Sequence, residues 1–195
     1  MDRSFLTGED ARIRSRYELA ETVKPDAPAD APTVDAAGHR LSTEIEGVVY
    51  SPAISHVDHR GSLTEVVNFD DGFWDEPIVH SYLFTINPGR IKGWGMHRKQ
   101  ADRYFVCRGN LRIVLFDGRV KSPTHERFAQ FHFADGSRGA LLIPPGVWHA
   151  DQNWGDTEAV VINHPTRPFD REHPDKYRID PESNEIPFDF RLRDG

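Results

Sequence analysis

The sequence predicts an all-β domain, and three features support this prediction. Short runs of apolar, β-branched and aromatic residues recur along the chain, with glycine, aspartate or proline between them. Almost no segment has the periodicity of about 3.6 residues that an amphipathic helix requires. The apolar residues cluster between about residues 45 and 165, which is enough chain to bury a core. About eight short strands of this kind indicate a sandwich or a barrel.

The predicted strands are short and are spread along the whole apolar region. They cover residues 47–51, 62–67, 79–86, 104–107, 111–116, 128–133, 140–143 and 159–163. The segment Arg108-Gly109-Asn110 predicts a hairpin turn between the fourth and fifth of these strands, and Asp117-Gly118 predicts the next turn. A further strand is expected to begin with His149.

The first 40 residues differ in composition from the rest of the chain. Thr7-Gly8-Glu9-Asp10 resembles a helix capping box and predicts a short helix that continues to Val23. In residues 24–32, three prolines alternate with small and acidic residues, a composition that cannot supply a packed core. We therefore expect a flexible N-terminal extension and linker over residues 1–40 and one domain over residues 41–195.

Composition excludes several classes of protein. The chain has 24 basic and 31 acidic side chains, and this net charge of −7 argues against a nucleic-acid binder, which needs a basic face. The single cysteine, Cys107, excludes an internal disulfide framework. No stretch of 18 apolar residues occurs, and no apolar signal core follows Met1. These features predict a soluble, cytoplasmic protein with no membrane or nucleic-acid partner.

One motif predicts where a functional histidine lies. The prolines of Pro144-Pro145-Gly146 stop a strand because they fix φ, while the glycine can take a positive φ in the turn. The turn then directs His149, on the next strand, toward one point. Residues 139–153 closely resemble the second cupin motif, and residues 92–106 resemble the first, with His97 in place of a His-x-His pair. The resemblance implies a jelly-roll barrel whose interior can hold a small ligand.

A wider set of motifs resembles the dTDP-4-dehydrorhamnose 3,5-epimerase family within the cupin superfamily. Residues 58–65, DHRGSLTE, are similar to its D-x-R-G-x-[FL]-x-E signature, and Gly95-Met96-His97 is similar to its G-L-H. Ser122-Pro123-Thr124 and Ile179-Asp180-Pro181 follow in the family's order. The resemblance covers about residues 46 to 190, and we interpret the chain as a divergent member.

This resemblance implies a function. The chain is expected to be a sugar-nucleotide epimerase or isomerase acting on a 4-keto-6-deoxyhexose nucleotide in deoxysugar or polysaccharide biosynthesis. Such an enzyme removes a proton next to a ketone and returns it from the opposite face, which requires a base, an acid and a group that stabilises the enolate. No cofactor or metal is expected. The resemblance also implies a homodimer and a short C-terminal segment that packs back on the barrel.

The resemblance assigns roles to individual residues. His97 matches the family's base, a role that suits histidine because its unperturbed pKa lies near neutrality. Asp180 matches the carboxylate that orients this imidazole. Arg60 and Glu65 resemble residues that contact the nucleotide, and the planar fork of arginine suits a diphosphate. His149 is expected to contact the substrate.

Three positions depart from the family. Trp94 replaces an arginine before Gly95, Asp102 replaces a lysine that helps to bind the enolate, and Asn163 replaces the tyrosine that acts as the acid. Asparagine cannot donate a proton at neutral pH, so we expect Asp102 and Asn163 to bind substrate instead. Tyr104 lies two residues after Asp102 and therefore on the same side of the strand, which makes it the predicted acid. Tyr82 is a second candidate for this role.

Two alternatives remain open from the sequence. In the cupin arrangement, Asp102 occupies the place of a carboxylate ligand, so that His97, Asp102 and His149 form a set suited to Fe(II) or a similar divalent ion. Lys99, two residues after His97, opposes this interpretation because its charge would repel a metal. The other alternative is a binding module that keeps the nucleotide pocket and has lost the catalytic acid.

Overall fold

A computed structural model describes residues 32, 34, 36 and 45–192 of the chain. The chain divides into two units, Met1–Leu41 and Ser42–Gly195, and the fold below is that of the second. The predicted helix and nearly all of the predicted linker lie outside the described residues, so the domain boundary stays a prediction. Among the described residues, no helix has the length and apolar character needed to span a bilayer.

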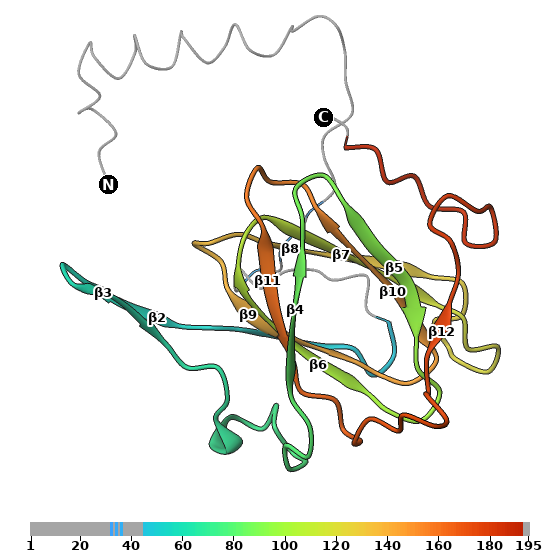
Figure 1. The fold of residues 1–195 in the computed structure, drawn as a ribbon, viewed down its shortest axis with the longest axis horizontal. Coiled ribbons are helices and arrows are strands. Elements are labelled where there is room, and N and C mark those ends of the chain that lie inside the picture. The colour runs from blue at the N-terminus through green and yellow to red at the C-terminus, as the bar shows by residue number, and fades with distance from the viewer. Residues whose placement is uncertain (1–31, 33, 35, 37–44, 193–195) are drawn as a thin grey trace, which may run out of the picture. The chain divides into compact units, whose positions relative to one another are not determined.

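Two five-stranded antiparallel sheets form the predicted jelly-roll barrel (Figure 1). The strands of the first sheet, in spatial order, are β1 (Val49–Pro52), β9 (Gly139–Ile143), β6 (Asp102–Arg108), β11 (Ala159–Asn163) and β4 (Tyr82–Ile86). Those of the second are β12 (Tyr177–Arg178), β5 (Ile91–Met96), β10 (Val147–Asn153), β7 (Leu111–Asp117) and β8 (Phe128–Phe133). The prediction of an all-β fold is confirmed.

A separate hairpin and one short helical turn complete the described elements. β2 (Ser55–Asp58) and β3 (Gly61–Thr64) pair only with each other, and this hairpin extends away from both sheets (Figure 1). The helical turn is the 3-10 helix η2 (Phe69–Asp71). The hairpin exposes Val57 and Leu63 to solvent, at 76% and 63% of their surface.

Most predicted strands are present, and two of them, 128–133 and 159–163, have the predicted ends. The predicted hairpin between β6 and β7 is wrong, because β6 pairs with β9 and β11 whereas β7 pairs with β10 and β8. The turn at Gly109 instead carries the chain from one sheet to the other. The same turn residues can join two strands of one sheet or carry the chain between two sheets, and only the packing of the sheets distinguishes these connections. β5 was not predicted because Gly93 and Gly95 interrupt its apolar pattern.

The core lies between the sheets and follows the two-residue period of the strands. On β7, Leu111, Ile113 and Leu115 are fully buried in the central cluster. Val114, which points the other way, is also fully buried, in a second cluster on the opposite face of β7. Both faces of β7 are therefore covered.

The C-terminal segment covers this second cluster, as predicted. Trp94 is fully buried there and packs against Phe188 and Phe190, with ring centroids 6.2 and 5.5 Å apart. The backbone N–H of Trp94 donates to the carbonyl of Ile179 at 2.8 Å, and the N–H of Ile179 donates back at 3.1 Å. The residue that replaces the family's arginine thus fastens the C-terminal segment to β5.

A buried carboxylate closes the end of β7. Asp117 is fully buried and accepts hydrogen bonds from Arg119 Nε at 2.8 Å and from the hydroxyls of Ser122 and Thr124, each at 2.6 Å. Burial alone would raise the pKa of Asp117, but the hydrogen bonds from these three residues outweigh it and hold the pKa well below the usual range. Arg119 also donates to the carbonyl of Glu46, at 2.7 Å. The Asp117 cluster therefore ties the chain entering β1 to the barrel.

Replacement of this carboxylate tests its contribution to stability. We expect Asp117→Asn to lower the free energy of unfolding by about 3–5 kcal/mol at pH 7, because it leaves Arg119 unpaired. Since the folded pKa is depressed, the stabilisation is present above the ordinary aspartate value of 3.8 and is lost as the pH falls toward the folded value. Urea unfolding should therefore show a constant difference from pH 7 to about pH 5 and a smaller one below. An equal difference at all pH values would contradict this account.

Candidate active site

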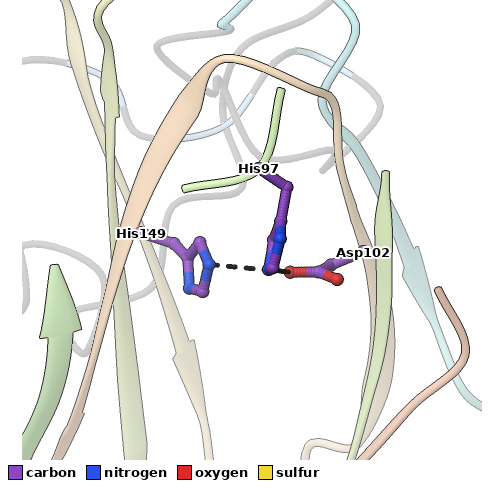
Figure 2. A group of neighbouring side chains, drawn as sticks. All are labelled: His97, Asp102 and His149. Carbon is purple, nitrogen blue, oxygen red and sulfur yellow. Dashed lines mark ion pairs between the residues drawn. The ribbon is translucent and has the colours of Figure 1, made fainter. Parts of the chain in front are cut away.

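Two imidazoles and a carboxylate meet between the sheets (Figure 2). His97 directly follows β5, Asp102 begins β6, and His149 lies on β10. Asp102 Oδ2 is 3.4 Å from His97 Nε2 and 3.6 Å from His149 Nε2. The side chains are nearly buried, with 11%, 2% and 10% of their surface exposed. A charge placed between these atoms is therefore poorly screened by water.

Hydrogen bonds determine which oxygen of Asp102 faces the imidazoles. Oδ1 accepts from Asn163 Nδ2 at 2.8 Å and from Gln100 Nε2 at 3.1 Å. Asn163 is held in turn, because its Oδ1 accepts from the backbone N–H of Arg103 at 3.0 Å. Oδ2 is left to face His97 and His149. Two departures from the family, Asp102 and Asn163, are thus direct hydrogen-bond partners.

The surroundings of His97 select its tautomer. Its Nδ1 contacts the backbone carbonyl of Asp175, and because a carbonyl only accepts, Nδ1 carries the hydrogen. In the neutral imidazole, Nε2 is then the unprotonated atom. The carboxylate of Asp175 accepts from the backbone N–H groups of Arg98 and Lys99, at 3.0 and 2.7 Å. Burial would raise the pKa of Asp175, but these bonds and the charge of His97 lower it below the usual value.

His149 has a different environment. Its Nδ1 lies 3.2 Å from the Tyr104 hydroxyl and 3.9 Å from Asp151 Oδ2, while its buried Nε2 has no hydrogen-bond partner among the described residues. Burial would lower the pKa of His149, but the neighbouring carboxylates of Asp151 and Asp102 raise it above the ordinary value. His149 therefore holds a proton to higher pH than a free imidazole.

Glycines make room for this arrangement. Gly146 takes a positive φ of 83° in the predicted turn before β10, and its N–H donates to the carbonyl of His97 at 2.7 Å. A Cβ on Gly95 would lie 3.2 Å from two atoms of the His149 ring, so glycine leaves space for that imidazole. The turn predicted to direct His149 is confirmed.

A cavity of about 420 Å³ adjoins the cluster through His149. Its volume is within the range of small-molecule sites. Burial and the charges of the nearby aspartates raise the pKa of Tyr104 well above its usual value and that of Tyr82 to about 12, so both hydroxyls keep their protons. The residues that line the cavity come from both sheets and the C-terminal segment: Tyr82, Phe84, Lys92, Gly93, Trp94, Gly95, Tyr104, His149, Asp151, Lys176 and Arg178.

Three predicted site residues lie elsewhere. Asp180 is exposed and accepts from the backbone N–H of Glu182 at 2.9 Å, and it is Asp175 that reaches His97 from this segment. Arg60 has 78% of its side chain exposed and pairs with Asp58 at 2.6 Å, on the projecting hairpin. Glu65 lines a separate cavity of about 300 Å³. The structure therefore does not bring Asp180, Arg60 or Glu65 to the cluster.

Several residues at the site were not predicted, among them Asp151, Asp175 and Lys176. Asp151 was detectable, because it lies two residues after His149 and thus on the same face of β10. Asp175 and Lys176 had no such signal. They lie in an irregular stretch more than 70 residues from His97, and only tertiary packing brings them to the site.

Comparisons with known proteins identify the family of this chain. Residues 56–177 match the model of the polysaccharide biosynthesis C-terminal domain family. The chain is 33% identical over 128 residues to the probable low-salt glycan biosynthesis epimerase of Haloferax volcanii, an alignment that covers 64% of this chain and 80% of that one. A dTDP sugar isomerase from Desulfovibrio desulfuricans G20 superposes with a TM-score of 0.68 at 30% identity, covering 74% of this chain and 91% of that one.

The predicted likeness to dTDP-4-dehydrorhamnose 3,5-epimerases extends to the fold. That of Bacillus anthracis superposes with a TM-score of 0.68 at 17% identity, covering 79% of this chain and 90% of that one. Fold and relatives together place the chain in the class of sugar epimerases and isomerases built on the cupin barrel, as a divergent member. More particularly, it belongs to the polysaccharide biosynthesis C-terminal domain family.

The contact between Asn163 and Asp102 can be tested directly. We expect Asn163→Ala to lower the free energy of unfolding by about 1–3 kcal/mol, because the buried N–H of Arg103 loses its acceptor and Asp102 loses a donor. Asn184→Ala, at an exposed position, is the matched control and should change it by less than about 0.5 kcal/mol. Urea unfolding measures both, and equal effects would contradict the role of Asn163.

Proposed function

We propose that this protein is a sugar-nucleotide epimerase or isomerase that acts on a 4-keto-6-deoxyhexose nucleotide, in the manner of dTDP-4-dehydrorhamnose 3,5-epimerases. The observation that carries the proposal is the tautomer of His97, whose unprotonated Nε2 faces a buried carboxylate in a cluster that adjoins a ligand-sized cavity through His149. The family match and the dTDP sugar isomerase among the relatives support a nucleotide-sugar substrate.

His97 acts as the base. Its Nε2 takes a proton from the carbon next to the ketone, and the imidazolium that forms lies 3.4 Å from Asp102 Oδ2. This ion pair stabilises the charged ring as the proton is transferred. The carbonyl of Asp175 keeps the ring in the required tautomer. Asp102 and Asp175 together thus perform the role that the family resemblance gave to Asp180.

Tyr104 acts as the acid. Tyr104 lines the cavity, and its hydroxyl, which stays protonated because its pKa is raised, lies 3.2 Å from His149 Nδ1. A tyrosine with a raised pKa gives up its proton less readily, unless a neighbouring group returns one. The protonated His149 next to it can replace the proton that Tyr104 gives up. In this mechanism Asn163 acts on the substrate indirectly, by holding Asp102 in place.

The predicted homodimer gives Arg60 and Glu65 a role. Arg60 lies on the hairpin that extends away from its own barrel, so we expect a second chain to present it to a nucleotide bound in the barrel (Figure 1). Glu65 directly follows this hairpin. The exposed Val57 and Leu63 of the hairpin supply apolar surface for such a contact. Homodimerisation and the cytoplasmic location stay predictions.

Oligomeric state is tested on the hairpin. Light scattering after size exclusion should give twice the chain mass for the wild type at micromolar concentration. Leu63→Asp should give the mass of one chain, because a charge in an apolar contact has no compensating partner. Val120→Asp, at a residue 82% exposed on the turn after β7, is the matched control and should leave the dimer intact. A monomeric wild type would rule out the dimer.

The role of His97 is tested by solvent exchange. In heavy water, the wild type should incorporate deuterium next to the ketone of dTDP-4-keto-6-deoxyglucose, as followed by proton NMR. His97→Ala should slow this exchange by about 10²–10⁴-fold. Its affinity for dTDP should stay within about threefold, because the base contributes little to nucleotide binding. His173→Ala, whose side chain is 83% exposed, is the control. Undiminished exchange in His97→Ala would eliminate this mechanism.

A second function, a metal-dependent cupin, is favoured by the convergence of donor atoms. One ligand atom from each of His97, Asp102 and His149 lies within 4.8 Å of the others. The Nδ1 atoms of both histidines face other groups, as is usual for metal-bound histidines, so the set fits a divalent ion such as Fe(II). These residues would hold the ion, which would supply a Lewis acid next to the cavity.

Metal content separates the two functions. For the metal-dependent enzyme, wild-type protein purified with added Fe(II) should carry one ion per chain, and Asp102→Asn should lose it. For the proposed epimerase, exchange should survive EDTA. Asp102→Asn should then slow exchange without any change in metal content, because the imidazolium loses its counter-charge. Elemental analysis and the exchange assay, performed on the same preparations, measure both outcomes.

A further inference from the structure

Proton removal next to a ketone requires a positive group as well as a base. The electron pair of the broken C–H bond moves to the ketone oxygen, and the enolate needs a cation or a strong hydrogen-bond donor at that oxygen. The position at which the family has its lysine holds Asp102, which has the opposite charge. His149 already has another role in the proposed mechanism, because its Nδ1 lies 3.2 Å from the Tyr104 hydroxyl and it returns the proton that Tyr104 gives up.

We infer that Lys176 supplies this positive charge by donating from its ammonium group to the enolate oxygen. The inference rests on the proposed epimerase function. Lys176 lines the same cavity as Tyr104, His149 and Asp151. The preceding residue, Asp175, holds His97 through its carbonyl. Of two consecutive residues in the C-terminal segment, one therefore holds the base and the other lines the cavity that adjoins the base's cluster through His149.

The charges around Lys176 favour an interaction with an anionic oxygen. Its ammonium group interacts electrostatically with Asp102 and Asp151 and with His149. Burial and the nearby charges of Arg178 and Lys92 lower the pKa of Lys176 below the usual lysine value. Because these neighbours crowd the ammonium group with positive charge, an oxyanion in the cavity relieves repulsion as it forms.

Lys92 is less well placed for the same role. It also lines the cavity, but its Nζ lies 5.3 Å from the centroid of the Phe84 ring, over the ring face. Lys92 is on β5, whereas Lys176 belongs to the segment that contacts His97. Of the two lysines, only Lys176 directly follows Asp175, the residue that orients the base.

The chemical step is balanced without any further reactant. The C–H bond next to the ketone breaks, its proton passes to His97 Nε2, and its electrons form the enolate with negative charge on oxygen. Lys176 donates a hydrogen bond to that oxygen and keeps its own proton. Protonation of the carbon from the opposite face then restores the ketone. The step involves no oxidation or reduction.

Kinetic comparison of three variants tests the inference. Deuterium exchange into dTDP-4-keto-6-deoxyglucose is measured for wild type, Lys176→Gln, Lys176→Arg and Lys121→Gln, together with dTDP affinity by calorimetry. Lys176→Gln should lower kcat for exchange by about 10²-fold, because the lost interaction forms mainly in the transition state. Its KM and dTDP affinity should stay within about threefold. Lys176→Arg should keep more activity than Lys176→Gln, since the charge is retained. Lys121→Gln, at an exposed position outside the cavity, should match the wild type.

The outcomes separate this inference from the function on which it rests. Equal kcat in wild type and Lys176→Gln overturns the role of Lys176 and leaves the epimerase function standing. A loss of dTDP affinity that accounts for the whole loss of activity also overturns it, because Lys176 then binds nucleotide. Absence of exchange in the wild type overturns the epimerase function and the inference together.

Discussion

The Asp102 carboxylate between two imidazoles is the constraint on which the site depends. A carboxylate with 2% of its side chain exposed is stable only where hydrogen bonds and positive charge compensate for lost hydration. Asn163 and Gln100 satisfy one of its oxygens, and the other faces His97 and His149. Asp102 begins a strand of one sheet, whereas His149 lies on a strand of the other sheet and His97 directly follows one, so this arrangement exists only in the closed barrel.

The C-terminal segment connects this polar site to an apolar cluster on the outside of the barrel. Phe188 and Phe190 pack on Trp94, whose backbone pairs with Ile179. This packing holds the stretch that contains Asp175 and Lys176 against β5. The tautomer of His97 and the position of a cavity cation thus depend on apolar burial in the second cluster.

The departures from the dTDP-4-dehydrorhamnose 3,5-epimerase pattern become coherent in the structure. Asp102 and Asn163 form one hydrogen-bonded pair, so a lone change at either position would leave a buried polar group without its partner. The Trp94 side chain is fully buried in the apolar cluster, so this position supplies no positive charge in place of the family's arginine. In the mechanism that we propose, the positive charge comes from a different part of the chain than in the family. A carboxylate takes the place of the family lysine on β6, and a lysine enters from the C-terminal segment.

The sequence by itself determined the all-β class, most of the strands, the turn before His149 and the grouping of His97, Asp102 and His149. These features depend on local pattern or on motif order, which a chain carries without being folded. Tertiary structure alone decided that β6 and β7 lie in different sheets, that Asp175 and not Asp180 reaches His97, and that Arg60 lies on a projecting hairpin. The reason is physical. Each of these outcomes depends on how surfaces far apart in the chain pack together, and neither spacing nor residue type encodes that packing locally.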